Sequence, residues 1–254
     1  MRISFAVLFG LALLAGCADK IEGRDWVTMG TTASVKVKGA SVDGVNGCAS
    51  TAREIVAVLE QLLNAHDPAS ELSRIAPLDD AEVVRICDAK VKGCYETAFK
   101  LRDQSGGAFN PRWKGEGTMD LGAIAKGFAV DCLADGIYMC LDEKSPLLFD
   151  IGGNLRARSG SWTVGIAGSE QTIVLTNGMA CATSAEYYRG KHIYDARTGN
   201  AVTNDLLSVT VVHPSSAMLA DGLSTICFIL GETEGEAFLR KFYPEARAIW
   251  IKKE

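Results

Sequence analysis

Few residues of this sequence are suited to bind a soft metal ion. Its 254 residues include three histidines and eight cysteines, yet no two cysteines form a CxxC pair and no histidine lies at zinc-finger spacing. Structural zinc sites are built from ligands with such spacing. The sequence therefore argues against a structural zinc site.

Basic clusters are also missing. The formal net charge is -5, and no run of lysine and arginine is interleaved with aromatic residues. Proteins that bind nucleic acid need a basic face for the phosphates. No GxGxxG segment follows an expected strand, so a Rossmann site has no support either. Nucleic acid is not an expected partner, and a doubly wound nucleotide fold is not expected.

The N-terminal segment resembles a lipoprotein signal. Arg2 precedes an apolar run over residues 5–14, which is too short for a permanent membrane-spanning helix. Leu14-Ala15-Gly16-Cys17 resembles a lipobox, which predicts a signal peptide over residues 1–16 and lipidation of Cys17. Residues 17–25 are then the lipidated N-terminus and a polar linker. The expected location is the bacterial cell envelope, in the outer or inner membrane, facing the periplasm; the alternative is a plain signal peptide with a coincidental cysteine.

Seven cysteines follow Cys17. We interpret most of them as small apolar residues of the core. Export would also permit disulfides, for which Cys87 with Cys94 and Cys132 with Cys140 are the nearest pairs.

Apolar periodicity divides the rest of the chain into helices and strands. Helices are expected over residues 45–64, 91–104, 122–140 and 217–230, and strands over 32–38, 147–151, 162–166, 172–175, 179–183, 207–213 and 246–251. Asn177-Gly178 predicts a hairpin between two of these strands. Strands flanked by helices, with hairpins in the middle, predict a single α+β domain over residues 26–254.

One segment whose groups suit ligand binding is Asp120-Leu-Gly-Ala-Ile-Ala-Lys-Gly127, where the helix over 122–140 is expected to begin. A helix start offers unpaired N–H groups and partial positive charge, which suit a diphosphate. Lys126 adds a cation. The alternative role of Asp120 is to cap this helix.

A second segment is the apolar helix around Asp221. Asp221 and Thr225 are four residues apart and share one helix face. A buried aspartate needs a partner, and magnesium prefers oxygen ligands. The alternative is a hydrogen bond from neighbouring backbone.

Two further segments are ambiguous by themselves. Asp150-Ile-Gly-Gly-Asn154 ends an expected strand, and its paired glycines allow either close approach of a ligand or a tight turn. His192 is a candidate proton carrier, although a lone histidine is more often structural.

The succession of these segments along the chain resembles that of the motifs in the ApbE family, the FAD:protein FMN transferases. The resemblance runs from Met29 to Leu230 and includes Met29-Gly-Thr-Thr32, Ser70-Glu-Leu-Ser-Arg74, Gly107-Ala-Phe-Asn110, residues 120–127, Gly152-Gly-Asn154, Thr183-Ser184, residues 192–199 and residues 220–225. It implies an α+β fold of the T-fold-like type, with mixed or antiparallel sheets packed against helices. It also implies that FAD binds beside Mg²⁺, and that FMN is transferred to a Ser or Thr hydroxyl of a flavin-acceptor protein.

The resemblance also implies roles for individual residues. Ala123, through its backbone carbonyl, Asp221 and Thr225 would bind the metal. His192 is the candidate base for the acceptor hydroxyl, held by Asp195 or by a backbone group. The residues expected to bind FAD are Met29, His66, Ala108, Phe109, Asn110, Asp120, Lys126 and Ile193.

The sequence departs from the family pattern at several positions. Asn110 replaces the usual aspartate, and His66 stands where many members place an aromatic ring over the adenine. The stretch between Asn110 and Asp120 is shorter than usual. Two alternatives stay open: an FAD pyrophosphatase that releases FMN and AMP, and a non-catalytic FAD-binding lipoprotein. No Ser/Thr-Gly-Ala-Ser/Thr segment is present, so the chain resembles the flavin donor enzyme rather than the acceptor.

Overall fold

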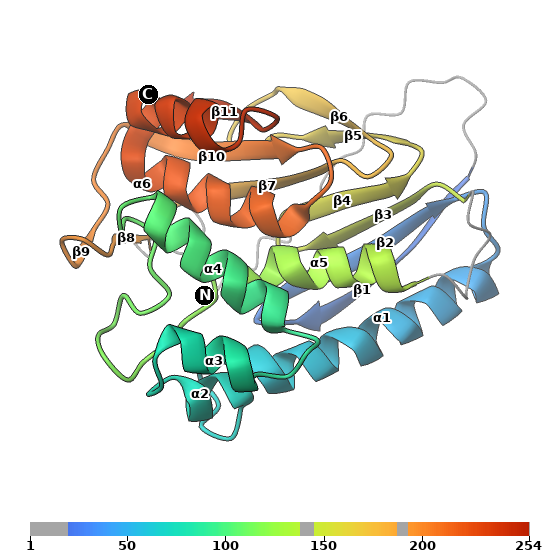
Figure 1. Cartoon of the computed structure of the whole chain (residues 1–254). Coiled ribbons are helices and arrows are strands. Elements are labelled where there is room, and N and C mark those ends of the chain that lie inside the picture. Colours follow the sequence, from blue (N-terminus) through green and yellow to red (C-terminus); the bar gives the residue numbers. More distant parts are fainter. Residues whose placement is uncertain (1–19, 138–144, 187–192, 254) are drawn as a thin grey trace, which may run out of the picture.

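The computed structural model describes residues 20–137, 145–186 and 193–253 (Figure 1). Its centre is a seven-stranded sheet in which every neighbouring pair is antiparallel. In spatial order the strands are β1 (Ile21–Thr28), β2 (Thr31–Lys38), β3 (Leu147–Ile151), β4 (Asn154–Ser159), β7 (Ala180–Ala185), β10 (Leu206–His213) and β11 (Arg247–Lys252). Two small hairpins accompany it: β5 (Ser161–Gly165) with β6 (Thr172–Thr176), and β8 (Tyr194–Asp195) with β9 (Asn200–Ala201).

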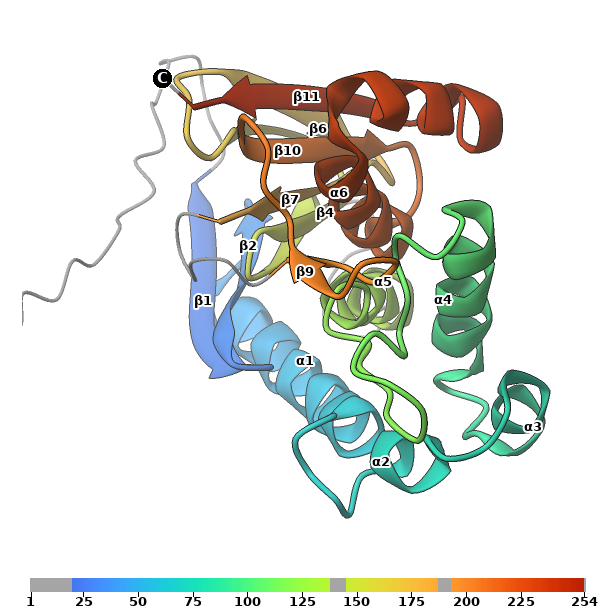
Figure 2. The ribbon, with the colours of Figure 1, turned by 90° about the vertical axis from the view of Figure 1, so that its left-hand side faces the viewer.

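Helices cover one face of the main sheet (Figures 1 and 2). The helices are α1 (Val42–Leu63), α2 (Glu71–Ile75), α3 (Asp80–Ile86), α4 (Lys92–Gln104), α5 (Ala125–Gly136) and α6 (Ala217–Phe242), and those that pack directly on the sheet are α1, α5 and α6. Helix α1 packs on β1 and β2, α5 on β3 and β4, and α6 on β7 and β10, which forms the larger apolar core. The β5–β6 hairpin covers part of the opposite face, where Trp162 and Leu175 belong to a second, smaller core. The prediction of one α+β domain is confirmed.

The hairpin predicted at Asn177-Gly178 is wrong, although the turn itself forms. The Met179 N–H donates to the Thr176 carbonyl oxygen at 2.7 Å, and Gly178 has a φ of +83°. However, β6 pairs with β5, whereas β7 pairs with β4 and β10. The apolar side chains of β6 pack in the second core, while the small residues of β7 fit beneath α6. The turn residues specify the local bend but not the partners of the strands that follow.

The helix expected over residues 122–140 begins at Ala125, so Asp120 does not cap it. The Leu121 carbonyl oxygen accepts hydrogen bonds from both the Ile124 and Ala125 N–H groups. This turn separates Asp120 from the helix, and the Asp120 carboxylate instead accepts a hydrogen bond from the Gly122 N–H at 2.9 Å.

The start of β1 and the end of α6 also differ from expectation. Strand β1 begins at Ile21, inside the segment expected to be a linker. Its less exposed face carries Glu22 and Arg24, so no apolar alternation marks the strand. The helix over 217–230 breaks at Gly231 as expected, where φ is +78°, but a second helical segment continues to Phe242.

The described cysteines support their interpretation as core residues. Cys48, Cys94, Cys181 and Cys227 are buried, and no disulfide joins any two of the described cysteines, so Cys87 is not bonded to Cys94. Cys17 and Cys140 lie outside the described residues. Among the helices in the described ranges, none has the length and apolar character needed to cross a bilayer.

Candidate active site

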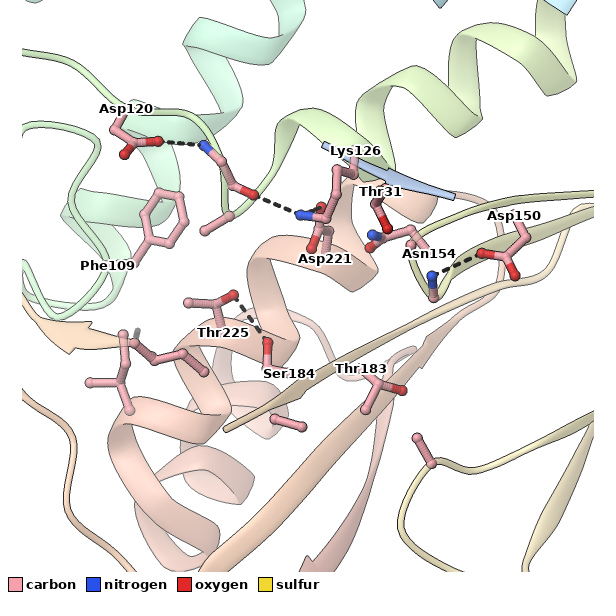
Figure 3. Close-up of a pocket in the computed structure, with 18 of the residues that line it drawn as sticks. Thr31, Phe109, Asp120, Lys126, Asp150, Asn154, Thr183, Ser184, Asp221 and Thr225 are labelled. Carbon is pink, nitrogen blue, oxygen red and sulfur yellow. Dashed lines mark hydrogen bonds and ion pairs between the residues drawn. The ribbon is translucent and has the colours of Figure 1, made fainter. Parts of the chain in front are cut away.

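A cavity of about 1130 Å³ lies at one end of the main sheet (Figure 3). At this end β2 begins, β3 turns into β4 and β7 ends, and the start of α5 faces the first turns of α6. The walls therefore combine strand ends, turns and a helix N-terminus, which are the places where polar groups remain unpaired.

The turn between β3 and β4 explains the paired glycines. Gly152 and Gly153 have φ values of +60° and +86°, as a two-residue hairpin loop requires. A Cβ atom on Gly152 would lie 2.8 Å from Thr31 Cγ2, and the Gly152 N–H donates to the Thr32 carbonyl oxygen at 2.9 Å. The tight turn expected as one alternative is present, and both glycines also line the cavity.

Asp221 is held where Gly127 of α5 packs against the backbone of α6. Its Oδ2 accepts a hydrogen bond from the Gly127 N–H at 3.0 Å and lies 3.7 Å from Lys126 Nζ. A Cβ atom on Gly127 would lie 2.2 Å from the Ala217 carbonyl oxygen, so only glycine allows this helix contact. Burial raises the pKa of Asp221, while Lys126 and the Gly127 N–H oppose that rise. The backbone hydrogen bond expected as the alternative role of Asp221 is therefore present, and the side chain also lines the cavity.

Further oxygen atoms surround Asp221. Thr225 Oγ1, one helical turn later, is 3.2 Å from Ser184 Oγ, and Ser184 Oγ is 2.9 Å from Ser224 Oγ. Asn154 Oδ1 is buried and receives no hydrogen bond within the described part of the chain. Ala123, Asp221 and Thr225 all line the one cavity.

This donor set fits a hard cation. The available groups are a carboxylate, hydroxyls, an amide oxygen and backbone carbonyls, and magnesium prefers such oxygen ligands. Across residues 20–137, 145–186 and 193–253, no group of three or more His, Cys, Asp or Glu side chains is placed to hold a metal. Zinc prefers nitrogen and sulfur ligands, whereas the donor set named above consists of oxygen atoms.

Aromatic side chains form another wall of the cavity. The rings of Trp113 and Tyr194 are stacked, with centroids 4.8 Å apart and an interplanar angle of 14°, and Phe109 and His66 also line the cavity. The loop that carries Trp113 is closed by a 2.7 Å hydrogen bond from the Asp120 N–H to the Pro111 carbonyl oxygen. This wall offers flat apolar surface against which a ring system can stack.

Asp120 lies beside the aromatic wall as an ionised carboxylate. Burial by itself would raise its pKa, but the hydrogen bond from the Gly122 N–H and an ion pair with Lys114 Nζ at 2.9 Å hold the pKa below its ordinary value. Lys126 Nζ, by contrast, donates to the Gly122 carbonyl oxygen at 2.7 Å on the side of Asp221.

The structure brings most of the expected site residues together. Those that line the cavity are His66, Ala108, Phe109, Asn110, Asp120, Ala123, Lys126, Ile193, Asp221 and Thr225. Met29 is not among the lining residues: it occupies the β1–β2 turn with a φ of +48°, and its N–H donates to the Glu60 carboxylate. Thr31 and Thr32, which follow it, do line the cavity. His192 lies outside the described residues.

Sequence reasoning missed Trp113, Tyr194 and Lys36 as lining residues, and it gave Asp150 no chemical role. Tyr194 directly follows Ile193, and Trp113 follows Asn110 by three residues. Their position next to expected site residues is the signal that could have identified them.

Comparison with known proteins identifies similar chains. The family model described as "ApbE family" matches residues 112–250. A Klebsiella pneumoniae protein named FAD:protein FMN transferase is 36% identical over 149 residues, which cover 53% of this chain and 46% of that protein. A Treponema pallidum protein of the same name is 35% identical over 162 residues, covering 52% of this chain and 43% of that protein. The chain thus spans a little under half the length of the curated relatives it matches.

Solved structures agree on the fold. "Flavin Transferase ApbE from Vibrio cholerae" has a TM-score of 0.77 at 21% identity, covering 93% of this chain and 94% of that chain. The Pseudomonas stutzeri flavinyl transferase ApbE in its apo form has a TM-score of 0.77 at 22% identity, covering 95% and 94%.

Proposed function

The chain belongs to the ApbE family, whose model covers more than half of it, and from this premise we propose that it is an FAD:protein FMN transferase. It cleaves the FAD pyrophosphate and attaches FMN through a phosphoester to a Ser or Thr hydroxyl of a target protein. The observation that carries the proposal is the position of Asp221, Thr225 and Lys126 in one cavity with an aromatic wall.

FAD fits the two kinds of wall. Its diphosphate would lie near Lys126 and the start of α5, where the cation and the helix N-terminus attract anions. Its ring systems would lie against Trp113 and Tyr194 or His66. The cavity, at about 1130 Å³, exceeds the range typical of drug-sized ligands, as a dinucleotide requires.

The residues that would hold a metal are Ala123, Asp221 and Thr225. When bound, Mg²⁺ would neutralise charge on the phosphoryl oxygens and on the AMP that leaves. The Gly127 N–H fixes the orientation of the Asp221 carboxylate, and Lys126 positions the diphosphate beside it.

The acceptor hydroxyl is a weak nucleophile and needs a base. We assign this role to His192, which directly precedes the lining residue Ile193. As the hydroxyl oxygen bonds to the phosphorus of FMN, the bond from that phosphorus to AMP breaks. AMP departs with the electron pair, and the hydroxyl proton passes to His192.

The proposed location follows from the lipobox. A lipid on Cys17 would anchor the chain in the cell envelope, with the domain facing the periplasm. A Cys17→Ala variant should lose incorporation of a labelled fatty acid in cells and appear in the soluble fraction. Label that persists in the variant would contradict lipidation at Cys17, and membrane association that persists without label would show that the lipid is not the only anchor.

Mass spectrometry tests the proposal and separates it from its alternatives. The purified protein is incubated with FAD, Mg²⁺ and a flavin-acceptor domain. A mass gain on the acceptor equal to FMN supports transfer. Free FMN and AMP without that gain identify a pyrophosphatase, and intact FAD identifies a binding protein.

Two variants serve as matched controls in this assay. Asp221→Asn is expected to lose activity by at least a hundredfold, because the amide lacks the charge that a cation needs. Asp205→Asn removes a carboxylate whose side chain is 71% exposed and which is not among the lining residues, so activity should not change. Full activity of Asp221→Asn would overturn the metal site.

A further inference from the structure

The cavity continues past the β3–β4 turn to the face of the sheet that is turned away from the helices. Asp25, Ser34 and Asp150 lie directly opposite one another on β1, β2 and β3, so their side chains project from the same face. Leu155, which is opposite Asp150 on β4, packs against the second core beneath the β5–β6 hairpin. That contact identifies the face. We call the part of the cavity lined by Asp25, Ser34, Lys36, Asp150 and Thr183 the second-face arm.

Asp150 places a carboxylate in the wall of this arm with one protein hydrogen bond. Its Oδ1 accepts a hydrogen bond from the Gly153 N–H at 2.8 Å (Figure 3), and no other hydrogen bond or ion pair reaches it from the described residues. Burial raises the pKa of Asp150 to about 6. Asp150 is partly exposed to the cavity, so a ligand bound in the arm can donate a hydrogen bond to the carboxylate oxygen that Gly153 leaves free.

The charges of the arm disfavour an anionic ligand. The arm carries two carboxylates, Asp25 and Asp150, against one cation, Lys36, so its net negative charge disfavours phosphate groups, whereas Lys126 and the start of α5 attract them on the helix side. A polypeptide segment carries N–H and O–H donors that match carboxylate oxygens. The chemistry of the arm therefore suits polypeptide better than FAD.

Resting on the proposed function, we propose that the second-face arm binds the segment of the acceptor protein that carries the modified hydroxyl. Asp150 Oδ2 accepts a hydrogen bond from an N–H or O–H group of that segment. Asn154 lines the cavity at the start of β4, and Figure 3 shows it between Asp150 and Asp221. A segment bound in the arm would therefore extend its hydroxyl towards the diphosphate.

The Asp150→Asn variant distinguishes binding of the acceptor protein from binding of FAD. The amide oxygen can still accept from Gly153, so the turn is kept, while the charged acceptor is lost. We expect the KM for the acceptor protein to rise about ten- to a hundredfold, as for a lost hydrogen bond to a charged group. FAD affinity, and the kcat at saturating acceptor, should stay within a factor of two or so. Asp205→Asn is the matched control.

The pH dependence provides a second readout. In the wild type, the KM for the acceptor should rise as pH falls through about 6, because protonation removes the charge of Asp150. Within the described ranges, the charged groups that act on Asp150 are Lys36 from β2 and Asp25 from β1. The variant should lose this dependence.

Direct binding keeps the inference distinct from the proposed function. In the acceptor domain, the Ser or Thr that receives FMN is replaced by valine. The affinity of this domain for the enzyme is then measured by calorimetry. Weaker binding by Asp150→Asn, and by Ser34→Val, which fills the arm, supports the inference even if the wild type transfers no FMN. Equal affinity for wild type and both folded variants, or no binding to the wild type, overturns it.

Discussion

Replacing Gly127 with alanine should force α5 and α6 apart. The added Cβ would lie 2.2 Å from the Ala217 carbonyl oxygen and 2.8 Å from Asp221 Cβ, whereas ordinary contact begins at 3.4 Å. Because the obstacles are backbone and a Cβ atom, no flexible side chain can rotate away. The helices must therefore separate by roughly 1 Å.

The separation has two costs and one gain. Overpacking a core costs about 1–3 kcal/mol. The hydrogen bond from Gly127 to the Asp221 carboxylate, worth about 1.5–3 kcal/mol, weakens as the helices part. Alanine gains about 1 kcal/mol of helix propensity over glycine. We expect a net loss of about 3 kcal/mol, which in a chain of this size lowers Tm by about 6–12 °C.

Thermal unfolding followed by circular dichroism tests this, with Gly136→Ala as the control. Gly136 lies in the same helix, but its added Cβ would meet only Ile55 Cδ1 at 3.7 Å, an ordinary contact. That variant should melt at or slightly above the wild-type temperature. If Gly127→Ala melts within 2 °C or so of Gly136→Ala, the close packing of the helices is not what requires glycine.

Three further predictions concern the cavity. His192→Ala should slow FMN transfer by at least about a hundredfold with FAD affinity retained; transfer at the wild-type rate would remove His192 from the mechanism. Trp113→Ala should weaken FAD binding by up to about tenfold, measured by flavin fluorescence, because a stacking surface is lost; unchanged affinity would place the rings elsewhere. Asp150→Asn should melt above the wild type at pH 7.5, because a folded-state pKa of about 6, above the ordinary 3.8, means that the ionised form destabilises the folded protein. That advantage should shrink as the pH is lowered from 6 towards 4, and a constant difference across this range would contradict the raised pKa.

The local pattern of apolar residues was sufficient to predict most of the helices and strands. The apolar spacing of residues 45–64 identified α1, and the run over residues 147–151 identified β3 within the bounds observed. These signals work because a helix or strand with one buried face must repeat its apolar residues at a fixed period. Strand β1 was missed because its less exposed face carries Glu22 and Arg24, so burial left no apolar alternation in the sequence.

The order of short motifs was sufficient to bring Ala123, Lys126, Asp221 and Thr225 into one hypothesis. All four line one cavity. The sequence could not show how Asp221 is held, because its partner, the Gly127 N–H, lies 94 positions away and the contact depends on two helices meeting without side chains between them.

The sequence by itself determined the α+β class, the approximate positions of most elements and the identity of the oxygen-bearing residues around Asp221. Only the tertiary structure decided that β6 pairs with β5 rather than with β7, and that Trp113 stacks on Tyr194. It also decided that Asp150 lines the cavity of Asp221 from the opposite face of the sheet. Strand partners and shared cavities depend on contacts between distant segments, and those contacts are selected by the burial of the whole core rather than by neighbouring residues.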